Sequence, residues 1–250
     1  TLQDLEFESV IQQVASHNVT SLGKIEVLAT LPFSKRDDVI EALQLTNEFV
    51  SSFDNENRIP NHGFDAITAE LKLIRIENNY LEIDGFRKIA SICVTTNILL
   101  KFFKKFHEYY PLLHKVSLQL ESNKEIPEAI NSVVDKFGEI RNDASDTLYG
   151  LRKSIQSVRI KINTSFNSAL STYNSLDYLD DIRETVMENR RVLAVKAMYR
   201  RKVKGSILGA SKTGSIVYIE PDTTQQHQRD LNNLAFEETE EIKRILLELT

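Results

Sequence analysis

The chain has 250 residues, of which 41% are hydrophobic, and its net charge is −5 at pH 7. It is long enough to bury a core in one large domain or two modest ones, and its few Gly and Pro residues favour a mainly helical fold. The single cysteine, Cys93, excludes an internal disulfide, and the longest apolar window, residues 89–106, is interrupted by three lysines and cannot span a membrane.

Apolar residues spaced by three and four predict helices through roughly the first 120 residues. Pro32 and the polar segment 51–63 interrupt this pattern, and a further break is expected near Asn123. These residues predict a globular helical platform in which Cys93 is a buried thiol. A helical pattern is already present at Leu2 and another is still periodic at Leu249, so we expect a fragment of a longer protein. The lone cysteine and the lack of a signal or membrane-spanning segment predict a cytoplasmic location.

Residues 101–106, KFFKKF, mix aromatic and basic side chains. Such a mixture fits a surface on which nucleic-acid bases stack, and it equally fits an amphipathic helix whose phenylalanines face a core. The second interpretation is favoured.

The most regular pattern begins at Ala144 and predicts one helix to about Ser175, roughly 48 Å long at about 1.5 Å per residue. Its apolar positions form one narrow stripe: Leu148, Leu151, Ile155, Val158, Ile162, Phe166, Ala169 and Tyr173. A helix this long needs a partner, and a second apolar series, interrupted by Glu238, supplies one: Leu231, Leu234, Ile242, Ile245, Leu246 and Leu249. We expect an antiparallel arm, with either a kink or a close contact at Gly150.

Between these helices the apolar period falls to about two, which predicts a small β-insert over residues 184–221. The expected strands are 184–187, 190–197, 203–208 and 215–219, joined by turns at 188–189, 198–202 and 210–214. Because four is an even number, the chain is expected to enter and leave the insert at the same end. The first and third turns, with Arg190, Arg191 and Lys212, would then lie far from the arm, and Arg200, Arg201 and Lys202 close to it.

The insert is strongly basic. Residues 185–214 hold eight Lys and Arg against Glu188 alone, a local charge of +7 that leaves −12 for the rest of the chain. A basic spot on an acidic body fits a polyanion held at one place, because clustered Lys and Arg bind phosphates that the remaining surface repels. A solvated hairpin face explains the charge equally well.

No pattern of catalytic or metal-binding residues stands out. The five histidines lie at no metal-ligand spacing, and no Ser/His/Asp or paired-carboxylate pattern is present. Residues 209–214, GASKTG, resemble a phosphate loop only superficially, because Ser211 precedes the lysine and a strand rather than a helix follows. We therefore expect no catalytic residue, no metal site and no cofactor in this chain.

Several segments together resemble the MutS family, specifically its second bacterial branch. The resemblance runs from about Leu5 to Leu249 and rests on these residues: 5–7 (LEF), 138–141 (GEIR), 143–145 (DAS) with Leu148, 191–196 (RVLAVK), Gly205, and Gly214 with 219–221 (IEP). It implies that residues 1–142 form a helical core domain, that 143–183 and 222–250 are lever helices, and that 184–221 form a β clamp.

In that family two subunits close their clamps around duplex DNA, while an ATPase domain at the far end of the levers sets the open or closed state. The resemblance thus implies a part of a DNA-dependent ATPase that binds double-stranded or branched DNA through its backbone, in repair or recombination control. ATP, Mg²⁺ and the main homodimer contacts would belong to an ATPase domain that this chain lacks. The implied DNA-binding residues are Asn189, Arg190, Arg191, Lys212, Lys196, Arg200, Arg201, Lys202 and Lys204.

The chain also departs from the family pattern. Met187 and Glu188 stand where the mismatch-repair branch has a Lys-Asn pair at the clamp tip, so phosphate contact is expected instead from Asn189, Arg190, Arg191 and Lys212. The N-terminal mismatch-reading domain is missing, so mismatch-specific readout is not expected.

Two other functions remain open. Some members of this branch are implied to act on collided ribosomes, and a basic clamp fits RNA as well as DNA. The chain could also be a coiled-coil scaffold that binds a partner protein through the apolar stripe of the arm, in which case the basic charge of the insert has no role in binding.

Overall fold

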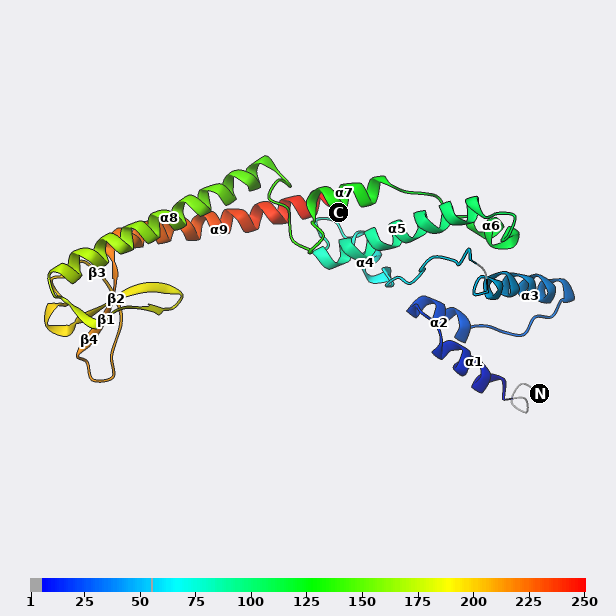
Figure 1. Cartoon of the computed structure of the whole chain (residues 1–250), viewed down its shortest axis with the longest axis horizontal. Coiled ribbons are helices and arrows are strands. Elements are labelled where there is room, and N and C mark those ends of the chain that lie inside the picture. Colours follow the sequence, from blue (N-terminus) through cyan, green and yellow to red (C-terminus); the bar gives the residue numbers. More distant parts are fainter. Residues whose placement is uncertain (1–5, 55) are drawn as a thin grey trace. The chain divides into compact units, whose positions relative to one another are not determined.

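The computed structural model describes residues 6–54 and 56–250, which divide into two compact units (Figure 1). The first comprises the described residues up to Arg141 together with Leu246–Thr250, and the second is Asn142–Ile245. Leu2 and Leu5, which the sequence analysis uses, lie outside the described residues. The fold is mainly helical with a small four-stranded antiparallel sheet, which confirms the predicted class at that level.

The first unit is helical. Its helices are α1 (Phe7–Ser16), α2 (Ser21–Leu28), α3 (Arg36–Ser51), α4 (Thr68–Leu73), α5 (Ile83–Lys105), α6 (Pro111–Ser117) and α7 (Glu125–Val133). Helix α5 packs against α6 and α7, and buried residues here include Phe86, Phe103 and Ile130.

The aromatic and basic segment 101–106 contributes to this core. Phe103 is buried, and its ring lies edge-on to the fully buried Tyr110, whose hydroxyl donates a hydrogen bond to the Asn57 carbonyl oxygen at 2.7 Å. The amphipathic-helix interpretation is therefore confirmed. Cys93, expected to be buried, is only half-buried, and burial raises the pKa of its thiol.

The second unit is an arm with a β-insert. It contains α8 (Asp146–Ser175), β1 (Leu179–Met187), β2 (Arg190–Lys196), a short 3₁₀ helix (Ala197–Tyr199), β3 (Gly205–Ala210), β4 (Ile216–Pro221) and most of α9 (Asp222–Leu249). In Figure 1, α8 and α9 lie side by side, and the sheet lies beside the C-terminal part of α8. Ion pairs and hydrogen bonds join Ser145 to Glu241 and Arg152 to Glu238, so the two helices run antiparallel.

The predicted stripe of α8 is confirmed. All eight of its residues are buried or half-buried, and Leu148, Ile155 and Phe166 are fully buried. The six predicted apolar positions of α9 also turn inward, and Glu238, which interrupts them, forms the ion pair with Arg152 at 2.7 Å. Helix α8 continues through Gly150, and the close contact expected as one possibility there is absent, because no neighbouring group outside the local helix backbone lies within 4 Å of where its Cβ would be.

The strands follow the order β1-β2-β4-β3, and every neighbouring pair is antiparallel. Since β2 and β3 both run opposite to β4, they are parallel to each other. The prediction that the chain enters and leaves the insert at the same end is therefore wrong. Residues 200–204 carry the chain along the sheet instead of reversing it, so β3 starts at the end where β4 stops.

The strands also differ in their bounds. β1 begins at Leu179 rather than residue 184, with an irregularity between Leu179 and Glu184, and β3 and β4 are shifted toward the C-terminus. Gly205 pairs with Pro221, and a Cβ on Gly205 would lie 2.2 Å from the Glu220 carbonyl oxygen. Only glycine permits this approach of β3 to β4.

No helix in the described part of the chain combines the length and the apolar character needed to cross a membrane.

Candidate nucleic-acid interface

The sheet packs one face against α8 and thereby fixes where the basic side chains lie. Phe166 of α8 belongs to one buried cluster with Leu193 and Val195 of β2 and Val217 and Ile219 of β4. The strand register then distinguishes two ends of the sheet. We call the end with the 188–189 turn and Pro221 the arm-side end, and the end with Lys196 and Ile216 the outer end.

The arm-side turn is a tight hairpin. Glu188 and Asn189 have φ values of 48° and 60°, and Met187 pairs with Arg190, as a two-residue turn of type I′ requires. The turn predicted at 188–189 is confirmed, but its predicted position far from the arm is wrong. Asn189, Arg190 and Arg191 line a pocket together with residues of α8 and α9.

Arg191 is fully engaged within the chain. Its Nε and Nη2 donate to Glu184 Oε2 at 3.0 and 2.6 Å, and its Nη1 donates to Asn163 Oδ1 at 3.3 Å. The guanidinium carbon lies 4.2 Å from the Phe166 ring centroid, a cation–π contact. These contacts fix the hairpin to α8.

Arg190 holds a buried carboxylate. Its Nη1 donates to Glu220 Oε2 at 3.0 Å, and the Glu220 side chain is only 3% exposed. A buried carboxylate deprived of its cation is strongly destabilising. Moving Arg190 onto a phosphate would therefore carry a large cost.

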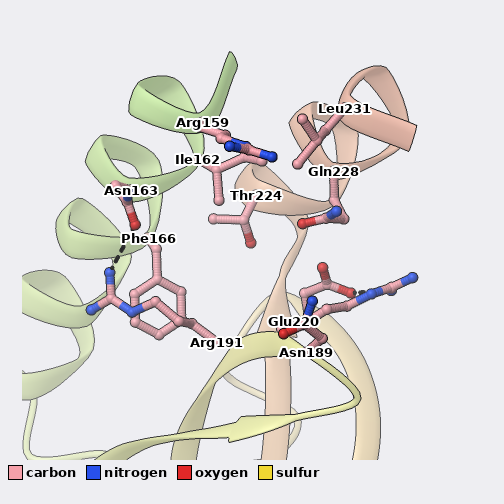
Figure 2. A pocket seen from close by; sticks show the side chains of 11 residues that line it. Arg159, Ile162, Asn163, Phe166, Asn189, Arg191, Glu220, Thr224, Gln228 and Leu231 are labelled. Atoms are coloured by element: carbon pink, nitrogen blue, oxygen red, sulfur yellow. Dashed lines mark hydrogen bonds and ion pairs between the residues drawn. The ribbon is translucent and has the colours of Figure 1, made fainter. Parts of the chain in front are cut away.

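The pocket beside this hairpin has a volume of about 240 Å³ (Figure 2). Residues from three elements line it. Those from α8 are Arg159, Ile162, Asn163 and Phe166; those from the hairpin are Asn189, Arg190 and Arg191; Glu220 of β4 and Thr224, Gln228 and Leu231 of α9 complete it.

The outer end is arranged differently. Lys196 Nζ donates to Asp177 Oδ1 at 2.9 Å, and this hydrogen bond raises the pKa of Lys196. The ring of Tyr178 stacks on Tyr199 at 4.5 Å between centroids, and Lys202 Nζ lies 5.5 and 5.6 Å from these two rings. The ring stack holds the loop that carries Arg200 and Arg201.

The remaining predicted cations are exposed. Arg200, Arg201 and Lys202 lie in the loop after the 3₁₀ helix, and Lys212 lies in the 211–214 turn, whose neighbour Ser215 accepts a hydrogen bond from the Ala197 amide. Among the residues that the structure describes, these four have no carboxylate within ion-pair distance. Lys204, also exposed, lies toward the arm-side end, where its amide donates to the Tyr173 hydroxyl at 3.2 Å.

The nine candidates divide into two groups, as predicted, but the members of each group differ from the prediction. Lys212 joins Arg200, Arg201, Lys202 and Lys196 at the outer end. Asn189, Arg190, Arg191 and Lys204 lie at the arm-side end. Sequence reasoning missed Arg159, because its exposed position on α8 is far in sequence from the insert. It also missed Tyr178 and Tyr199, whose stacking has no local sequence signal.

The chain is similar to several proteins named endonuclease MutS2. Over the whole chain it is 29% identical to an endonuclease MutS2 of Clostridium perfringens, 28% identical to one of Symbiobacterium thermophilum and 28% identical to one of a Geobacillus species. It spans only 31–32% of the length of these relatives. No family model matches the chain.

Proposed function

We propose that this chain is the core, arm and clamp portion of a MutS2-like protein, and that it holds nucleic-acid backbone through the outer end of its β-insert without reading base sequence. The likeness to proteins named MutS2 over the whole chain supports a DNA-related role.

One observation carries the choice of surface. Arg200, Arg201, Lys202 and Lys212 are exposed at one end of the sheet and have no carboxylate partner in the described ranges, although the whole chain has a net charge of −5. Unpaired cations bind phosphates without first breaking an internal ion pair, and the counterions released from DNA favour association. The insert offers no helix to a major groove, so contacts to the backbone would position the duplex without specifying sequence.

The same proposal assigns roles to the other elements. Helices α8 and α9 act as levers that transmit a conformational state along the arm to the insert. ATP and Mg²⁺ would bind to a part of the protein outside these 250 residues, so that this chain contributes no catalytic group of its own. Two copies would close their inserts around one duplex.

The test is binding of the chain to a fluorescent 30-base-pair duplex across a salt series. An Arg200→Gln/Arg201→Gln/Lys212→Gln variant is compared with Lys24→Gln/Lys72→Gln/Lys101→Gln, which removes the same charge from exposed positions of the first unit. Each lost phosphate contact lowers the slope of log K against log salt by about 0.9. We expect the slope to fall by about 3 in the first variant and to stay near wild type in the control.

Equal weakening in both variants would show that only net charge matters and would overturn the assignment of the surface. No salt-dependent binding of the wild-type chain to this duplex would overturn the phosphate-binding proposal itself.

A further inference from the structure

The arm-side pocket is rich in hydrogen-bond donors that lack partners. Arg159 is exposed on α8, and no carboxylate in the described part of the chain pairs with it; Figure 2 shows it extending toward α9. Arg190 uses only Nη1 to donate to Glu220, and its Nε and Nη2 have no partner among the described residues. The Asn189 side chain likewise forms no hydrogen bond there.

Two acceptors in the pocket already receive hydrogen bonds from arginines. Glu220 accepts from Arg190, and Asn163 Oδ1 accepts from Arg191. Glu184, just outside the pocket, is neutralised by Arg191, whose Nε and Nη2 both donate to Glu184 Oε2. Three guanidinium groups therefore face two carboxylates, and the surplus positive charge lies on Arg159, the arginine that no carboxylate neutralises. Such a site favours an anion with several acceptor oxygens, which a phosphate group provides.

The pocket is also larger and more apolar than a phosphate alone requires. Ile162 of α8 and Leu231 of α9 contribute apolar walls, and the volume of about 240 Å³ leaves room for a sugar or a base beside the anion. Arg191 already covers the Phe166 ring, so the apolar contact would come from the two aliphatic side chains.

We propose that this pocket binds the phosphate ester of a nucleotide. The phosphate accepts hydrogen bonds from Arg159 and from Nε and Nη2 of Arg190, whose Nη1 stays on Glu220, with Asn189 donating beside them. The sugar or base packs against Ile162 and Leu231. The site is separate from the outer end, so it does not rest on the proposed backbone-binding function. A ligand here would bridge the hairpin and both arm helices.

The same chemistry has two sources, a free mononucleotide or a nucleotide within a strand. Equilibrium dialysis of the 250-residue chain with labelled AMP and, separately, with labelled tetrathymidylate distinguishes them. The test variants are Arg159→Gln and Asn189→Gly, the latter suited to the positive φ of this turn. Lys161→Gln is the matched control, because it removes one charge from an exposed position of α8 outside the pocket lining.

We expect Arg159→Gln to weaken ligand binding about tenfold, as expected for one charge-assisted contact to phosphate, and Lys161→Gln to change it less than about twofold. If AMP binds and is weakened by Arg159→Gln but not by Lys161→Gln, the ligand is a free nucleotide. If only tetrathymidylate shows this pattern, the ligand is a nucleotide within a strand. Equal effects of the two charge variants, or no binding of either probe at 5 mM, overturn the proposal. Duplex binding that keeps the wild-type salt dependence in Arg159→Gln shows that the outer end holds backbone independently of this pocket, so failure of one proposal is distinguishable from failure of the other.

Discussion

Both ends of the β-insert carry basic residues, but most of these residues have different partners at the two ends. At the arm-side end, Arg190 and Arg191 are held by Glu220 and Glu184, and Arg191 also covers Phe166. At the outer end, Arg200, Arg201 and Lys212 are exposed without a carboxylate partner within the described residues. Charge alone therefore does not identify a polyanion surface. A cation that neutralises a buried carboxylate contributes to the fold, whereas an unpaired one remains available to a ligand.

The largest effect is expected when the arm-side pairing is broken. Arg190→Ala leaves the 3%-exposed Glu220 carboxylate without its cation, and we expect a loss of about 2 kcal/mol in the free energy of unfolding. Hydrogen exchange of the β2 amides reports this locally. The double variant Arg190→Ala/Glu220→Gln should recover part of the loss, because the uncompensated charge is gone.

Lys212→Ala is the outer-end control for this measurement, and it should change stability by less than about 0.5 kcal/mol. If Arg190→Ala is as mild as Lys212→Ala, the distinction between paired and unpaired ends does not hold.

A third paired carboxylate, Glu241, lies where Ser145 of α8 meets α9, and its pairing makes the stability of the protein depend on pH. Hydrogen bonds from Arg244 and then Ser145 lower the pKa of Glu241 from 4.5 to about 2. Because the folded-state pKa is the lower one, the stabilisation is fully present above about pH 4.5 and is lost as pH falls toward 2. Urea unfolding between pH 7 and 2.5 should therefore show a steeper loss of stability in wild type than in Glu241→Gln.

Ser145→Ala acts on the same group from the other helix. The Ser145 hydroxyl caps α8 by accepting from the Leu148 amide at 3.0 Å and donates to Glu241 Oε1 at 2.7 Å. Its removal should cost about 1 kcal/mol at pH 7 and less at pH 2.5. A pH-independent cost would show that the cap alone matters.

The smallest effect is expected on the solvent face of the arm. Gly150→Ala adds a methyl group that meets nothing within 4 Å and restricts the unfolded chain, so it should stabilise α8 by about 0.5–1 kcal/mol. Thermal unfolding followed by circular dichroism measures this change. A destabilised variant would contradict the absence of any neighbouring group at this position.

Features set by near neighbours were predictable from the sequence. The stripe from Leu148 to Tyr173 follows from helical spacing, and the 188–189 turn follows from alternation broken by two polar residues. The mainly helical class with one small antiparallel sheet follows from the same local patterns. The clustering of basic residues in the insert is also evident from the sequence.

Only the tertiary structure decided which of these basic residues remain available. The partner of Arg190 is Glu220, thirty positions along the chain, and the two meet because β4 pairs with β2 rather than with β3 alone. Local periodicity specifies that strands exist but not their order, since alternative orders bury the same alternating side chains. The parallel placement of β2 and β3 moved Lys212 to the same end as Arg200 and turned Arg190 toward the arm.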